Sequence, residues 1–155
     1  MQTRRRIYPR RSRSLANWVA HLSVLCVEVP FKQLRGQRDI ALIFHGTGRD
    51  VQQTTAGEIV MFDVLRVWKG TVPRRITIYN VGSEPGSEPS ERFSFARDTS
   101  YFVTAYQLPR WYRLAFGLPE AGPPFSGGGF CSAHVADAAR VRAATPNDPG
   151  HEPLQ

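Results

Sequence analysis

The chain has 155 residues, of which 41% are apolar and 21% charged, and these values predict one soluble globular domain and exclude wholesale disorder. No apolar run approaches the roughly 18 residues that cross a bilayer, and two cysteines exclude a disulfide-dense miniprotein or a four-cysteine zinc site. The net charge of +7 is local, because six arginines lie within the first 14 residues and the remainder carries 14 basic and 13 acidic residues. A nearly neutral remainder gives no electrostatic case for a nucleic-acid groove.

Residues 1–25 combine this basic arm with an apolar stretch. Apolar side chains recur at spacings of three and four over residues 15–29, which predicts a helical face. A positive start before an apolar stretch also resembles a secretory signal, although Asn17, His21 and Ser23 interrupt it. We expect an exported protein, secreted or in the cell envelope. The alternative is a cytoplasmic protein whose arm leads into a short surface helix.

The dense part of the chain begins with two predicted strands. Residues 40–46 form an apolar run that predicts a buried strand, with a bend or bulge at Gly46 and Gly48. Residues 52–57 have the polar, glycine-ended composition of a hairpin loop. Residues 58–68 are β-branched and aromatic on both faces, so we expect a second strand that is covered on both sides.

Two more strands follow. After a turn at residues 69–73, isoleucines alternate with other side chains in a third strand at residues 74–81. Residues 82–92 hold three acids and two prolines, which predicts a solvated loop. Residues 101–106 then read as a fourth strand.

The last predicted strands are short. Pro109 ends the fourth strand, and the aromatic residues 111–116 favour a fifth. Residues 119–129 are rich in proline and glycine and predict a loop, and residues 130–132 complete a last short strand. Five or six short strands with little helix are typical of a small all-β barrel or sandwich.

Residues 134–144 are rich in alanine and carry two late arginines, which predicts a helix with its cations at the favourable C-terminal end. We therefore divide the chain into an arm or signal segment (1–25), a barrel domain (26–145) and a polar tail (146–155). We expect residues 1–14 and the tail to be poorly ordered.

The order of these segments carries a family resemblance. It rests on Asp39–Gly46, Phe62–Gly70, Ile76–Tyr79, Phe93–Phe95, Tyr101–Tyr106 and Phe130–Ser132. The order resembles netrin-like domains, in particular the bacterial relatives of tissue inhibitors of metalloproteinases, over about residues 26–140. The resemblance implies a mainly β fold: a small five-stranded OB-type barrel with a flanking C-terminal helix and an N-terminal arm or short helix.

The resemblance also implies a disulfide. In the family a cysteine before the first strand is bonded to one after the last strands, and Cys26 and Cys131 occupy those places. If the chain stays in a reducing cytosol, two free thiols are expected instead. The family often begins with Cys-x-Cys, whereas Val27 and Glu28 follow Cys26 here.

The sequence offers no convincing catalytic set. His45 stands at a strand end and His134 at a helix start, and the proximity of Ser132 and Asp137 to His134 is of a kind that occurs by chance. No Cys/His spacing fits zinc, and no glycine-rich loop has a dinucleotide or phosphate fingerprint. We expect no catalytic residue, no metal site and no cofactor, so the protein is not predicted to be an enzyme.

Aromatic residues are divided between core and surface. We expect a core that contains Phe44, Phe62, Trp68, Tyr101 and Phe102. Trp111, Tyr112 and Phe116 follow a proline and are the candidate binding face, although packing against the barrel is the default expectation for them.

Three functions remain open at this point. The first is a non-catalytic binding module of the netrin-like type, exported or envelope-associated, with a protein partner. The second is a zinc metalloproteinase inhibitor that begins at Cys26, and the bulky Leu25 disfavours the cleavage it needs. The third is a nucleic-acid-binding OB barrel that acts through its basic arm.

Overall fold

The computed structural model describes residues 31–81, 94–127 and 133–155. The described strands are β1 (Ile40–Thr54), β2 (Gly57–Lys69), β3 (Arg75–Val81), β4 (Ser100–Gln107), β5 (Phe125–Ser126) and β6 (Ala133–Val135). The described helices are α2 (Phe31–Gly36), α3 (Arg110–Ala115) and α4 (Ala138–Ala144). None of these helices is both long and apolar enough to span a bilayer.

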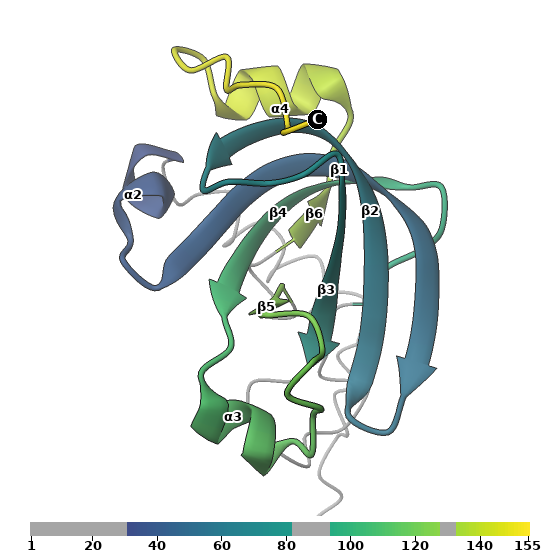
Figure 1. Ribbon diagram of the computed structural model, residues 1–155. Helices are drawn as coiled ribbons and strands as arrows, with labels where there is room; N and C mark the ends of the chain where they lie inside the picture. Colours follow the sequence, from purple (N-terminus) through teal and green to yellow (C-terminus); the bar gives the residue numbers. More distant parts are fainter. Residues whose placement is uncertain (1–30, 82–93, 128–132) are drawn as a thin grey trace, which may run out of the picture.

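The strands close into a barrel (Figure 1). β1 is antiparallel to β2 on one side and to β4 on the other, and β2 is antiparallel to β3. β5 completes the ring because it pairs in parallel with β3 and antiparallel with β4. The fold is therefore mainly β, a closed five-strand barrel with flanking helices that matches a small OB-type barrel, as predicted.

The predicted bend of β1 is confirmed. Its register against β2 shifts at three places, two of which adjoin Gly46 and Gly48. A Cβ atom at Gly46 would lie 3.0 Å from the carbonyl oxygen of Asp63, and one at Gly48 would lie 3.0 Å from that of Ala96. A side chain would therefore be unusually tight at either position, and glycine suits the place where β1 bends close to its neighbours.

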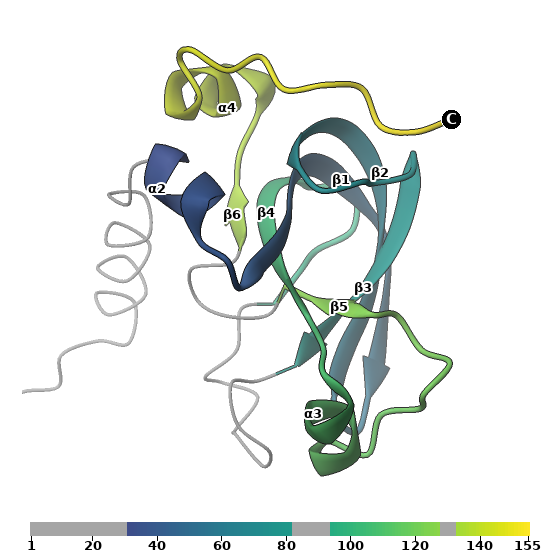
Figure 2. The same cartoon turned by 60° about the vertical axis from the view of Figure 1, so that its left-hand side comes forward.

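Two apolar layers form on the two sides of the sheet. Inside the barrel, Phe62 packs edge-on against Phe44 and Phe95, with ring centroids 5.5 and 5.2 Å away. Outside it, α2 and α4 cover one end of the sheet (Figure 2), and Trp68 and Phe102 lie beneath them. All five aromatic residues expected in the core are buried.

Two details of the first hairpin differ from expectation. The predicted loop at residues 52–57 is mostly strand, because β1 and β2 remain paired up to Thr54 and Gly57 and leave a two-residue turn. β2 is not covered on both sides throughout. Ile59 packs against the cluster that contains Tyr79 and Val81, and Val67 lies in the interior cluster with Phe62. Leu65, in contrast, is 49% exposed.

The prediction of a strand at residues 111–116 is wrong, because this segment is α3. Pro109 is extended and precedes the first helical turn. The helix ends where the amide of Gly117 donates to Leu114 O and that of Leu118 to Arg113 O, at 3.1 and 2.8 Å. This is the Schellman arrangement, and the positive φ of +65° at Gly117 suits it. The ring position between β3 and β4 belongs to β5 instead, inside the segment predicted as a loop.

The C-terminal part also departs from the sequence prediction. α4 begins at Ala138 rather than at His134, because the Asp137 carboxylate accepts the amide of Arg140 at 2.8 Å and caps the helix there. Residues 146–155, expected to be a poorly ordered tail, pair with the barrel through His151 and Leu154. The predicted strand at residues 130–132, the acidic loop and residues 1–25 lie outside the described residues.

Replacing Phe62 tests the barrel interior. Phe62→Ala removes a ring that touches several others, and we expect it to lower the free energy of unfolding by about 3–5 kcal/mol. Leu65→Ala, on the same strand but half exposed, is the control and should cost about 0.5 kcal/mol. Urea unfolding of both variants measures the difference. Equal losses would contradict the assignment of the core.

Candidate functional site

α3 lies at one end of the barrel, in the connection between β4 and β5 (Figure 1). Its inner side joins an apolar cluster with Tyr79 and Val81 of β3, and Ala56 in the β1–β2 turn packs against the same cluster. OB-type barrels bind ligands over strands 2 and 3 and at the loops that join strands 1–2 and 4–5. α3 therefore occupies a position that this architecture uses for recognition.

The three candidate aromatic residues all lie on α3 or at its end, but they differ in exposure. Trp111 is 69% exposed, whereas Tyr112 and Phe116 are partly buried in the cluster beneath the helix. The Tyr112 and Phe116 rings stack with centroids 4.5 Å apart, and Trp111 meets Tyr112 edge-on at 5.5 Å. The rings of Tyr112 and Phe116 thus attach the helix to the barrel, and the ring of Trp111 faces outward.

Leu114 belongs to the same exposed face, and the sequence interpretation missed it. It is 66% exposed and follows Trp111 by three residues, so the two side chains are neighbours on the helix surface. In the predicted strand they would have pointed to opposite faces. We call Trp111 and Leu114 the α3 face.

Arg113 holds the loop around the α3 face. Its guanidinium donates to the carbonyl oxygens of Glu120 and Pro123 at 2.9 and 3.1 Å and has three longer contacts of the same kind. Arg110 is different, because its contact with Glu120 at 3.3 Å joins two side chains that are each more than 70% exposed. Such a pair contributes little to stability, so Arg110 remains accessible beside Trp111.

His45 is buried, and its ring is hydrogen-bonded to the backbone. It is 5% exposed, and its Nε2 lies 3.0 Å from the carbonyl oxygen of Ala136, so this nitrogen carries the proton and donates. Burial lowers the pKa of His45, and the hydrogen bond to Ala136 and the charge of Asp137 only partly oppose that effect. The residue joins β1 to the segment that leads into α4.

Among the other candidates for chemistry, Asp137 lies close enough to act on His45 through its charge. His134 pairs with Phe102 in register, and Asp137 is engaged as the cap of α4. Ser132, Cys26 and Cys131 lie outside the described residues, so the predicted disulfide stays a prediction. Within residues 31–81, 94–127 and 133–155, no three His, Cys, Asp or Glu side chains gather as metal ligands would.

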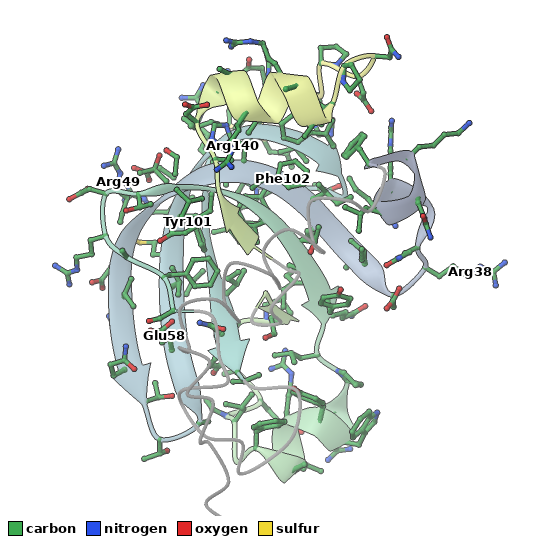
Figure 3. The ribbon with its side chains drawn as sticks, turned by 180° about the vertical axis from the view of Figure 1, so that it is seen from behind. Arg38, Arg49, Glu58, Tyr101, Phe102 and Arg140 are labelled. Carbon is green, nitrogen blue, oxygen red and sulfur yellow. The ribbon has the colours of Figure 1, made fainter. Side chains whose placement is uncertain are left out.

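Glu58 is a buried carboxylate that sequence reasoning did not find. It is 6% exposed and lies below Tyr101 in Figure 3, toward the α3 end of the barrel. Its oxygens accept hydrogen bonds from Ser94 Oγ and Asn80 Nδ2, both at 2.6 Å, from Gln53 Nε2 at 2.9 Å and from the amide of Phe95 at 3.3 Å. Burial raises the pKa of Glu58, but the four hydrogen bonds together outweigh it and keep the pKa below its usual range.

Comparisons of the whole chain with models of protein families, with curated proteins and with solved structures found no significant match. The netrin-like resemblance therefore remains a prediction, and the arguments below rest on the chain's own residues.

Glu58 should make the stability of the barrel depend on pH. Because its pKa is lower in the folded chain, its contribution is present above its ordinary pKa of 4.5 and is lost as the pH falls through the lowered value. Glu58→Gln should cost about 1–3 kcal/mol at neutral pH, and this cost should shrink in acid. Urea unfolding across that range measures it, with the exposed Glu120→Gln as control. A cost that does not change with pH would show that the charge of Glu58 is not what stabilises the barrel.

His45 should also make the stability of the barrel depend on pH, in a higher pH range than Glu58 does. Its lowered pKa means that its contribution is full above the ordinary value of 6.5 and is lost as the pH falls from there toward the folded value. Unfolding free energies at about pH 8 and pH 5.5 should therefore differ less in His45→Gln than in the unaltered chain. His151→Gln, exposed in the structure, is the control. An identical pH dependence in all three proteins would contradict this role.

Proposed function

We propose that this chain is a non-catalytic binding module of the netrin-like type, exported or envelope-associated, which contacts a protein partner through the α3 face. The observation that carries the proposal is the exposure of Trp111 and Leu114, 69% and 66%, on a helix fixed to the end of the barrel. Large apolar side chains that adjoin one another on a surface are typical of interaction sites.

The rigidity of the α3 face supports this function. The rings of Tyr112 and Phe116 fasten the helix from below, and Arg113 ties the loop that follows it. A partner would bind Trp111 without first ordering the segment that carries it, which lowers the entropic cost of association. Tryptophan beside an accessible arginine is also the composition of energetically dominant interface positions.

The charge distribution favours a protein partner over a nucleic acid. On β1, β2 and β3 the arginines are matched by acids. Asp63 accepts from Arg49 and Arg75 at 2.8 and 3.1 Å, and Asp50 pairs with Arg97. Paired arginines make a weaker case for phosphate contacts than free ones do. The nucleic-acid alternative thus depends on the basic arm, and the inhibitor alternative depends on Cys26, both outside the described residues.

A crosslinking experiment tests the α3 face. A photo-reactive amino acid at position 114 should give a defined crosslinked species in the native host, and the same group at the half-exposed position 65 should not. Adding Trp111→Ala to the position-114 protein should reduce that species about tenfold or more, because the indole supplies much of the contact. Identical species from positions 114 and 65, or no effect of Trp111→Ala, would refute the proposal.

The N-terminus of the protein isolated from its host decides between the first two functions. Mass spectrometry should find an N-terminus other than Cys26, since Leu25 is a poor cleavage junction. Protein that begins at Cys26 and inhibits zinc metalloproteinases would establish the inhibitor instead.

A further inference from the structure

The last strand-like segment of the structure is the strap, which we define as residues 146–155. It leaves α4 and crosses the end of the barrel above β1 and β2 (Figure 2). β3 pairs with β2 only as far as Asp63, so the remaining edge of β2 has no partner from β3. The strap takes that place, since His151 donates to Val67 O at 2.8 Å and Val67 donates to His151 O at 2.9 Å.

A second set of backbone bonds holds the other side of the strap. Leu154 donates to the carbonyl oxygen of Val72 at 2.9 Å, and the amide of Arg74 donates to Leu154 O at 3.1 Å. The strap therefore lies between the edge of β2 and residues 72–74. Backbone pairing of this kind binds an extended peptide whatever its side chains, and specificity has to come from the positions that meet side chains of the barrel.

Three positions of the strap supply that specificity. The carbonyl oxygen of Asp148 accepts the indole N–H of Trp68 at 2.9 Å, while its carboxylate accepts the amide of Gly150 at 3.0 Å and pairs with Arg35. Gly150 has a φ of +65°, and a Cβ atom there would lie 2.7 Å from Val67 O and 3.0 Å from the Trp68 ring. Pro153 is buried. We call the surface that holds the strap, formed by Val67, Trp68 and residues 72–74, the seat. The contacts of the strap show that the seat selects the pattern Asp-x-Gly-x-x-Pro.

The strap is separable from the barrel. The closed ring consists of β1, β2, β3, β5 and β4, and no strap residue belongs to it. Detaching the strap would uncover one edge and the Trp68 indole without breaking any pairing of the ring. The seat lies at the end of the barrel opposite α3, so it is distinct from the α3 face (Figure 1).

We propose that the edge of β2 at Val67, together with residues 72–74 and Trp68, is a strand-addition site for an extended peptide of the pattern Asp-x-Gly-x-x-Pro. The chain's own strap occupies it in the free protein. Attachment to α4 gives the strap a high effective concentration, so the site is closed unless the strap is displaced by a matching segment of another chain.

The test uses the full chain with its seat intact and its strap weakened. Gly150→Val prevents the strap from seating, because the added side chain meets Val67 O and the indole. A fluorescent peptide with the sequence of residues 146–155 should then bind the Gly150→Val protein about tenfold or more tightly than it binds the unaltered protein. The same peptide with valine in place of its glycine should bind neither.

Gly36→Val is the matched control protein. A Cβ atom at Gly36 meets nothing within 4 Å, so the strap should stay seated and peptide binding should remain as weak as in the unaltered chain. The proposal is overturned if the folded Gly150→Val protein binds the peptide no better than the unaltered chain, or if the valine peptide binds as well as the glycine peptide.

Hydrogen exchange on the unaltered protein decides the question even if Gly150→Val does not fold. The amides of His151, Leu154, Val67 and Arg74 are all bonded across the strap. If the strap detaches locally, these four should exchange together and at least about tenfold faster than amides of the β1–β2 ladder. Exchange at the same rate as that ladder would mean that the strap leaves only on global unfolding, and would refute the proposed site.

Discussion

β1 has to pair with β2 and β4 at once, and the barrel closes only because its backbone bends while doing so. Residues 43–47 pair with β2 on one side and with β4 on the other. The register against β2 shifts just before Gly46 and again just after Gly48. The close approach of the carbonyl oxygens of Asp63 and Ala96 leaves little room for a Cβ atom at these glycines. Closure then creates an interior for Phe62 and an outer surface for α2 and α4.

Closing the ring leaves two ends, and the chain covers each in a different way. At one end α3 is fixed by apolar contacts and by Arg113, and its outer residues Trp111 and Leu114 remain exposed. At the other end the strap is held by backbone pairing at Val67 and by the indole of Trp68. The first end offers a preformed apolar surface and the second a hydrogen-bonding edge already in use, so the two proposed sites recognise different chemistry.

The sequence was sufficient for the parts of the fold that repeat a simple pattern. β1 to β4 each contain an alternating or apolar stretch, and the pattern predicts their existence and order. The three aromatic residues at positions 111–116 favour a strand, whereas Pro109 and Gly117, which bound this segment, are typical of the two ends of a helix, and a helix is what forms. β5, with two residues, is too short for any periodicity, and the strap is polar because its backbone does the binding. Glu58 was unpredictable for a related reason: its donors Asn80 and Ser94 become neighbours only when the barrel forms.

The meaning of the chain's net charge depends on where its charged residues lie and on whether they are paired. A net charge of +7 indicates an anionic ligand only if the cations are free and adjacent. In the described barrel Arg49 and Arg75 share Asp63, and Arg113 is occupied with backbone carbonyl groups. The charges of Arg49 and Arg75 are therefore partly compensated by Asp63, although both side chains are exposed. The two proposed sites instead offer apolar contact beside the accessible Arg110 at the α3 face and backbone hydrogen bonding at the strap's seat.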